Sequence, residues 1–262
     1  MTRIIALANQ KGGVGKTTTA VNVAAVLAEA DQRVLLLDLD PQCNASSGLG
    51  VRAADRTHST YGLLAGEASF AEVTSPTLLE GLFLIPSSPD LAAADIELAG
   101  AKGREHLLAR VLKSVDPAYD FVFIDCPPSL GLLTLNALVA APEVLIPIQC
   151  EYYALEGVSQ LMNNIEMVRA HLNPRLTVST VILTMYDGRT KLADQVSSEV
   201  RRYFGDKVLR TVIPRSVKVS EAPGYSMTII DYDPGSRGAM SYLDASRELA
   251  TRDTSASVEA QS

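Results

Sequence analysis

Residues 10–18 combine glycines, lysines and hydroxyls in an order that suits phosphate binding: Gln-Lys-Gly-Gly-Val-Gly-Lys-Thr-Thr. The glycines let successive backbone N–H groups turn toward phosphate oxygens, and Lys16 can reach the terminal phosphates of a nucleotide. The hydroxyl of Thr17 is a ligand for Mg²⁺. The general template has a glycine where this chain has Gln10, and it lacks the extra cation that Lys11 supplies. The segment predicts a nucleotide site built on an unusual, lysine-rich loop.

Two acidic positions follow an apolar run at residues 34–37. Asp38 and Asp40 lie two residues apart, so strand alternation puts both carboxylates on one side, with Asp40 nearer the carboxyl end of the strand. Asp40 is placed there to orient an attacking water and to touch the Mg²⁺ shell, whereas Asp38 is better placed to support the loop. Taken alone, these acids followed by Pro41 also suit a turn that ends a strand. The phosphate loop nearby favours the chemical interpretation.

Another acid follows a second apolar strand, because Phe121-Val-Phe-Ile precedes Asp125 in the form of a Walker B strand. Its carboxylate can hold a metal-bound water beside Mg²⁺. Two prolines stiffen the next residues, Cys126-Pro-Pro-Ser129, which suits either a switch that reports on the γ-phosphate or a rigid turn. Cys126 has no accompanying His or base motif, so we expect a small buried residue rather than a nucleophile.

A local excess of positive charge lies between residues 189 and 218, where eight cations and three acids give +5 in a chain of −7 overall. Such a contrast suits a surface that binds nucleic-acid phosphates without reading sequence. For Arg201 and Arg202 a solvated helix face explains the charge at least as well. The eight cations are Arg189, Lys191, Arg201, Arg202, Lys207, Arg210, Arg215 and Lys218.

Short apolar runs without inside–outside alternation recur along the chain, as is typical of strands covered on both faces. Helix-length segments separate most of them, so we predict an α/β fold: a doubly wound, mostly parallel sheet with helices on both faces. Loops after strands are where such sheets keep their ligand sites. The predicted strands are 4–8, 34–37, 82–85, 121–124, 144–148 and 178–183, the helices 17–31, 154–171, 194–204 and 238–250, and the loops 46–50, 86–89 and 126–129.

Length and composition set limits on this chain. Its 262 residues, 47% of them hydrophobic, suit a single P-loop domain over residues 1–250, followed at 251–262 by a polar tail that we expect to be disordered. The net charge of −7 argues against a globally basic nucleic-acid binder. Three isolated cysteines argue against a disulfide framework or a zinc site and favour a reducing cytosol. The sequence predicts neither a signal peptide nor a membrane span.

Five motifs together resemble the bacterial ParA/Soj chromosome-partitioning ATPases, over about residues 2–250. The resemblance implies a deviant Walker A ATPase that binds ATP with Mg²⁺ and closes into a nucleotide-sandwich homodimer. It further implies that the dimer binds double-stranded DNA non-specifically, and that slow hydrolysis is stimulated by a ParB/Spo0J-type centromere-binding partner. The expected location is the cytoplasm, in association with the nucleoid and not with a membrane. The motifs are Lys11-Gly-Gly-Val-Gly-Lys-Thr-Thr, Asp38-Leu-Asp-Pro-Gln, Ile124-Asp-Cys-Pro-Pro-Ser, Gln149-Cys-Glu-Tyr-Tyr-Ala-Leu-Glu-Gly157 and Ile213-Pro-Arg-Ser-Val-Lys-Val-Ser-Glu-Ala-Pro223.

The resemblance also implies a role for each matching residue. Lys11 would reach across the dimer to the phosphates bound by the partner, as an arginine finger does, and Gly12 would lie at the dimer face, where a side chain would block close approach. The expected catalytic residues are Lys11, Lys16 and Asp40. The expected ATP-binding residues are Lys11, Gly12, Gly13, Val14, Gly15, Lys16, Thr17, Thr18, Pro214 and Ser216. The expected Mg²⁺ residues are Thr17, Asp125 through water, and Asp40 in the outer shell. The expected DNA-binding residues are Arg189, Arg215 and Lys218.

Two positions depart from the family pattern: Cys43 stands where a glycine is usual, and Ser216 where an asparagine is common. Three alternatives remain. A MinD-like membrane ATPase is disfavoured because residues 238–262 lack lysine and end in a tail without bulky apolar residues. A nitrogenase-type iron protein needs cluster-bridging cysteines, and lone core thiols explain these cysteines better. A module that binds ATP without hydrolysing it is disfavoured by Asp40.

Overall fold

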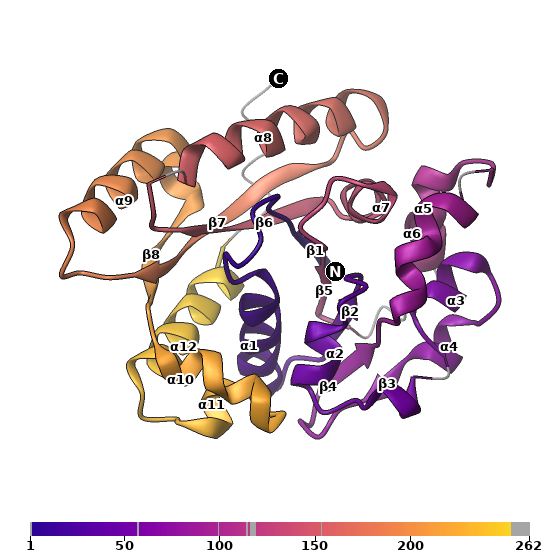
Figure 1. Cartoon of the computed structure of the whole chain (residues 1–262), viewed down its shortest axis with the longest axis horizontal. Helices are drawn as coiled ribbons and strands as arrows, with labels where there is room; N and C mark the ends of the chain where they lie inside the picture. The colour runs from indigo at the N-terminus through magenta and orange to yellow at the C-terminus, as the bar shows by residue number, and fades with distance from the viewer. Residues whose placement is uncertain are drawn as a thin grey trace.

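The computed structural model describes residues 2–252 except 57, 99, 114, 116–118 and 153. In these residues one eight-stranded sheet has the order β3-β4-β2-β5-β1-β6-β7-β8 (Figure 1). All neighbouring strands are parallel except β3 and β4. The strands are β1 (Arg3–Leu7), β2 (Val34–Asp38), β3 (Ser75–Pro76), β4 (Leu82–Ile85), β5 (Phe121–Asp125), β6 (Glu143–Gln149), β7 (Thr177–Tyr186) and β8 (Val208–Pro214).

Helices cover both faces of the sheet, because every strand except the short, exposed β3 divides its apolar side chains between two cores. In β1, for example, Ile5 and Leu7 enter one core and Ala6 enters the other. The first core is closed by α1 (Lys16–Glu29), α2 (Asn44–Gly48), α11 (Ile229–Tyr232) and α12 (Arg237–Ala250). The second is closed by α3 (Thr60–Ala65), α6 (Leu107–Leu112), α7 (Leu132–Ala140), α8 (Ala154–His171) and α9 (Lys191–Phe204). Short helices α4 (Phe70–Val73), α5 (Ala94–Glu97) and α10 (Val217–Glu221) complete the α-helices of the described chain. The predicted doubly wound fold is confirmed.

Several local predictions are wrong. Residues 46–50, expected as a loop, lie largely in α2. The set of four predicted helices is incomplete, and α7 is the longest helix it lacks: this helix is apolar on nearly all sides, so it shows no amphipathic period. Strand β8 was also missed, since Arg210 and Thr211 interrupt its apolar run. The loop at 126–129 is present as predicted.

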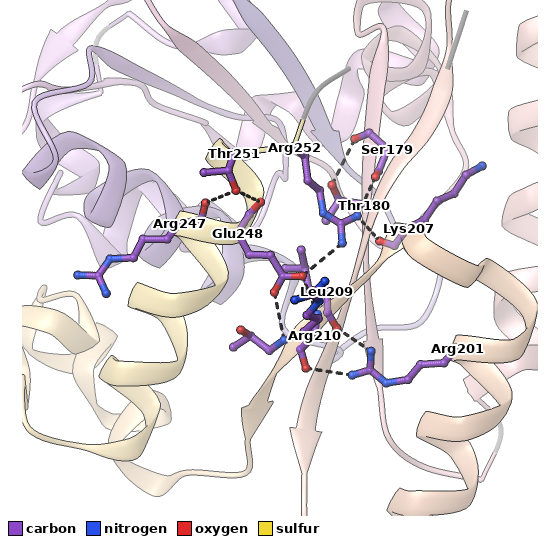
Figure 2. A network of polar contacts seen from close by, with 11 residues as sticks. Ser179, Thr180, Arg201, Lys207, Leu209, Arg210, Arg247, Glu248, Thr251 and Arg252 are labelled. Carbon is purple, nitrogen blue, oxygen red and sulfur yellow. Dashed lines mark hydrogen bonds and ion pairs between the residues drawn. The ribbon is translucent and has the colours of Figure 1, made fainter. Parts of the chain in front are cut away.

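Strand β8 is an edge strand whose outer backbone groups are covered by neighbouring side chains (Figure 2). From α9, the guanidinium of Arg201 donates to the carbonyls of Leu209 and Arg210, at 3.0 and 3.1 Å. From α12, the carboxylate of Glu248 accepts the N–H groups of Arg210 and Thr211, at 2.7 and 3.2 Å. An exposed strand edge is a template for pairing with other chains, so these contacts protect it.

The chain is anchored beyond the end of α12. Arg252 donates to the carbonyls of Ser179 and Lys207, at 3.3 and 2.7 Å, and forms an ion pair with Glu248 at 3.5 Å (Figure 2). The hydroxyl of Thr251 donates to the carbonyl of Arg247 at 3.0 Å. The first two residues of the predicted tail, 251 and 252, thus contact the rest of the chain, and residues 253–262 lie outside the described residues.

Candidate active site

The phosphate-binding loop leaves the carboxyl end of β1, which lies between β5 and β6 in the middle of the sheet. The chain turns to opposite sides at this point, since β1 leads to β2 and β5 leads to β6, which is the position where doubly wound sheets bind ligands. Gly13 and Gly15 have φ of +72° and +87°, a left-handed conformation that glycine adopts without strain. The first helical hydrogen bond of α1 runs from Thr19 N–H to the carbonyl of Gly15. The N–H groups of residues 16–18 therefore precede the helical ladder, as an anion site requires.

Lys16 lies inside this loop among acidic groups. Its side chain is buried, and Nζ donates to the carbonyl of Lys11 at 3.5 Å. Burial lowers the pKa of Lys16, while the charges of Asp125, Cys126 and Asp40 act in the opposite direction. The structure thus brings the expected phosphate-binding lysine and the two expected acids to one place.

Asp125 ends β5 and is fully buried. Neither of its carboxylate oxygens has a hydrogen-bond partner in the described part of the chain. Burial raises its pKa well above the usual value and the charge of Asp38 adds to this, whereas nearby Thr17 and Lys16 act against it. A buried carboxylate without donors suits a site that receives a cation or cation-bound water, so the residues present fit Mg²⁺ with a bound nucleotide.

Asp38 supports the segment that carries Asp40, as the sequence suggested. Its Oδ2 accepts the N–H and the hydroxyl of Ser46, at 2.9 and 2.6 Å, and its Oδ1 accepts the N–H of Asp40 at 3.2 Å. The Ser46 hydroxyl in turn accepts the N–H of Ser87, whose own hydroxyl donates to the carbonyl of Asp40. Burial raises the pKa of Asp38 to about 6, although its hydrogen bonds oppose this. This network begins α2 and fixes the backbone around Asp40.

Asp40 itself is buried close to the loop. Its Oδ1 accepts the N–H of Gln42 at 2.9 Å. Its Oδ2 accepts no hydrogen bond among the described residues, while the backbone that carries Asp40 is fixed. Cys43 follows with φ of +56°, the left-handed conformation that glycine adopts most readily. The structure therefore explains why a glycine suits this position.

Two residues that sequence reasoning missed hold the phosphate-binding loop in place. Asn9 donates from Nδ2 to the carbonyl of Pro147 at 2.7 Å and accepts the N–H of Lys11 at 3.0 Å. The hydroxyl of Thr184 donates to the carbonyl of Val14 at 2.8 Å. These contacts fasten the loop to β6 and β7. A polar residue inside the apolar run of β7 was the available signal for Thr184.

Lys11 and Gly12 differ from the rest of the loop, because their roles cannot be explained by contacts within this chain alone. The ammonium of Lys11 is not directed at its own loop but lies 3.8 Å from the carboxylate of Glu151, and about two-fifths of the side chain is exposed. A Cβ added to Gly12 would meet nothing within 4 Å, and its φ lies outside the left-handed region. Neither the fold nor the loop in this chain therefore requires glycine at position 12.

The three expected DNA-binding residues lie at the same edge of the sheet as the loop, since they follow the carboxyl ends of β7 and β8. Each one is paired with an acid. Arg189 binds Asp187 at 2.7 Å, Arg215 binds Glu151 at 2.7 Å, and Lys218 binds Glu221 at 3.3 Å. Of the acidic partners, Glu151 and Glu221 lie in two of the motifs quoted above but had no expected role, and Asp187 lies in none of them.

Arg189 and Arg215 are close neighbours, because the N–H of Arg215 donates to the carbonyl of Tyr186 at 3.0 Å. Hydrogen bonds from Arg189 lower the pKa of Asp187 to about 2, and the charge of Arg215 contributes. Arg201 is different, since its guanidinium covers β8 (Figure 2). Two of the expected cations therefore form one surface, and Arg201 has a structural role.

The remaining expected residues fall near this edge. Pro214 ends β8, and Ser216 precedes the first residue of α10. All three cysteines are unpaired and buried, and burial raises the pKa of each thiol. They are accordingly core thiols. In the described part of the chain no helix is long and apolar enough to cross a membrane.

The chain is similar to known proteins over most of its length. A family model described as an AAA domain matches residues 2–178. The sporulation initiation inhibitor protein Soj of Bacillus subtilis is 54% identical over 250 residues, which cover 95% of this chain and 99% of that protein. The chromosome-partitioning ATPase Soj of Thermus thermophilus is 53% identical over 250 residues, covering 95% and 96%. A cobyrinic acid a,c-diamide synthase structure from Mycobacterium smegmatis, with bound ADP and magnesium, is similar at a TM-score of 0.84 and 38% identity, covering 95% and 94%.

Proposed function

This chain belongs to the ParA/Soj family of chromosome-partitioning ATPases, and from that premise we propose that it segregates DNA through an ATP-dependent, DNA-binding dimer. It is an ATPase that uses ATP and Mg²⁺. The observation that carries the proposal is the convergence of Lys16, Asp125 and Asp40 on one loop while the ammonium of Lys11 lies outside it.

Each residue of the loop has a distinct part in hydrolysis. The N–H groups of residues 16–18, which precede the helical ladder, and the ammonium of Lys16 bind and orient the phosphates. Thr17 and Asp125 would hold Mg²⁺, which neutralises phosphate charge when it is bound. The carboxylate of Asp40 accepts a hydrogen bond from the attacking water and orients it toward the γ-phosphate. Asp38 keeps Asp40 in position through the contacts of its two oxygens.

Lys11 acts on the nucleotide of a second subunit in this proposal. Its side chain already lies outside its own loop and is part-exposed, which supports an action across a dimer. A positive charge supplied there stabilises the charge that develops in the transition state. The open space at Gly12 supports a close approach of the second subunit, because nothing in this chain occupies it.

The surface formed by Arg189, Arg215 and Lys218 is the proposed contact with DNA. Exposed cations bind the phosphate backbone of DNA, and sequence is read only by an element that enters a groove and contacts base edges. We therefore expect binding that is independent of sequence. A dimer doubles the number of cations, which makes DNA binding depend on ATP. Hydrolysis, stimulated by a ParB-type partner, then opens the dimer and releases it from the nucleoid.

The MinD-like alternative needs an apolar helix face for a membrane. In α12 most apolar residues, among them Tyr242 and Leu249, are buried in the core against the sheet. Met240 is half exposed, but a single apolar side chain does not make such a face within the described residues. Its outer side carries Arg247, in an ion pair with Asp244. This arrangement favours DNA over membrane as the surface that the protein binds.

A binding experiment separates these alternatives. Wild type, Asp40→Ala and Lys16→Ala are mixed with random-sequence double-stranded DNA or anionic liposomes, in ATP, ADP or no nucleotide. We expect wild type to bind DNA much more tightly in ATP than in ADP or without nucleotide. Tight binding should persist without hydrolysis in Asp40→Ala, and ATP should not tighten DNA binding by Lys16→Ala, because this variant cannot bind ATP. Liposome binding without DNA binding would contradict the proposal.

A further inference from the structure

Glu151 lies between the phosphate-binding loop and the proposed DNA surface. Its Oε2 is 3.8 Å from the ammonium of Lys11, and its Oε1 accepts a hydrogen bond from the guanidinium of Arg215 at 2.7 Å. The two cations come from segments more than 200 residues apart in the sequence, yet they approach one carboxylate from two sides. The single carboxylate of Glu151 therefore pairs with two cations. In the proposed function each of these cations binds a phosphate, Lys11 that of a nucleotide and Arg215 that of DNA.

The backbone around this cluster is held at both ends. The N–H of Cys150 donates to the carbonyl of Thr184 at 3.0 Å, and the Thr184 hydroxyl holds the carbonyl of Val14 in the loop. Two residues further along β7, Tyr186 accepts the N–H of Arg215. The main chain of the loop, of Glu151 and of Arg215 is thus fastened to the same strand. Only the side chains of the cluster are free to exchange partners.

Exposed side chains of this kind change partner readily. Lys11, Glu151 and Arg215 have side chains exposed to 39, 43 and 55%. An ion pair at such exposure is weak. The terminal phosphate of ATP, with its greater charge, competes with Glu151 for Lys11, and the singly charged phosphates of DNA, which are present in large number along the backbone, compete with it for Arg215. Each phosphate contact that Lys11 or Arg215 makes must first displace Glu151.

We propose that Glu151 is a positioning residue shared by Lys11 and Arg215, which restrains both cations until a phosphate takes them. The inference rests on the proposed function, and it adds one residue that links the nucleotide step with DNA binding. Glu151 keeps the ammonium of Lys11 paired within its own subunit and keeps Arg215 partly neutralised until a phosphate is present. Because the same carboxylate restrains both, its removal affects dimer formation and DNA binding together.

Asp187 provides a matched control. It also pairs with an arginine of the DNA surface, at 2.7 Å, but the pair is with Arg189 and not with Lys11. The substitutions Glu151→Gln and Asp187→Asn remove one negative charge each and keep the side-chain shape. They differ in whether a loop lysine is released.

The experiment measures two quantities for wild type, Glu151→Gln and Asp187→Asn. These are the affinity for random-sequence DNA without nucleotide and the protein concentration at which ATP drives dimer formation, followed by sedimentation. Both variants are expected to bind DNA about two- to fivefold more tightly, the range for release of one exposed ion pair. Only Glu151→Gln is expected to lower the dimerisation midpoint, by about four- to 25-fold because a dimer contains two such lysines. In a Lys11→Gln background, Glu151→Gln should no longer change that midpoint.

Four outcomes decide between these possibilities. A dimerisation midpoint that Glu151→Gln leaves unchanged, or that it lowers equally in the Lys11→Gln background, would overturn the inference. The same holds if Glu151→Gln and Asp187→Asn behave alike in both measurements. Failure of the wild type to bind DNA in ATP would overturn the proposed function instead, while the dimerisation series would still decide whether Glu151 restrains Lys11.

Discussion

The salt dependence of DNA binding offers a quantitative test of the proposed surface. Each subunit contributes Arg189, Arg215 and Lys218, so a dimer offers two times three, or six, phosphate contacts. Since each contact contributes about −0.9 to the slope of log K against log salt, the slope for wild type should be about −5.4. Arg215→Ala removes two contacts per dimer and should reduce the slope to about −3.6.

These slopes translate into a large difference in affinity. Between 50 and 200 mM salt, wild type should lose affinity about 1,800-fold and Arg215→Ala about 150-fold. Fluorescence anisotropy with labelled random-sequence DNA and saturating ATP, over a series of KCl concentrations, measures both. The result has to be independent of sequence, because the contacts are with phosphates.

Arg169→Ala is the matched control. Arg169 is also an exposed arginine in an ion pair, with Glu166, but it lies in the last turn of α8, which leads into the start of β7 at the opposite edge of the sheet. Its loss changes net charge as Arg215→Ala does and should leave the slope near the wild-type value. If Arg169→Ala flattens the slope as much as Arg215→Ala does, long-range charge and not a defined surface governs binding, and the surface assignment is refuted.

Three further results are expected. Gly12→Val should keep ATP binding and thermal stability, because the added side chain meets nothing in its own chain, but it should block the close approach of a second subunit and so prevent ATP-driven dimer formation. A normal dimer in sedimentation with ATP would contradict this. Thr184→Val should weaken ATP binding measured by calorimetry, since the buried carbonyl of Val14 loses its donor at a cost of about 1–3 kcal/mol, whereas unchanged affinity would place the loop's support elsewhere. Burial raises the pKa of Glu248, but two backbone N–H donors and the charge of Arg252 outweigh it, so the net pKa lies below its usual value. This contribution to stability is present above the unfolded pKa of about 4.3 and is lost as pH falls through the lower folded pKa. Urea midpoints of Glu248→Gln should therefore decline less on acidification than those of wild type, and parallel declines would contradict the assignment.

Much of the fold was predictable because it rests on local pattern. The buried strands β1, β2, β5 and β6 are continuous apolar runs, and such runs need cover on both faces. The predictions failed where the local pattern is ambiguous. Helix α7 is apolar all round, and β8 carries polar residues that bond to Glu248 and Arg201 across its outer edge. Glu248 and Arg201 come from other elements, so the residues near β8 in the sequence are not enough to predict this strand.

The chemistry divides in the same way. The order of glycines, Lys16 and Thr17 is enough to predict a phosphate-binding loop, because glycines there permit the left-handed backbone that the loop needs. The contacts from Thr184 and Pro147 that hold the loop in place come from the tertiary structure. An acid after an apolar strand likewise sets Asp125 at the strand's carboxyl end. Both can be read from neighbouring residues.

The partners of these residues were decided only by the tertiary structure. Asp38 and Asp125 become neighbours because β2 pairs with β5, and Glu151 meets Lys11 and Arg215 because β6, β1 and β8 end at one edge of the sheet. The strand order depends on how the whole chain buries its apolar faces. It cannot be predicted from the distance in sequence between two charged residues. Glu151 precedes Arg215 by 64 residues, so their pairing exists only once the sheet has formed.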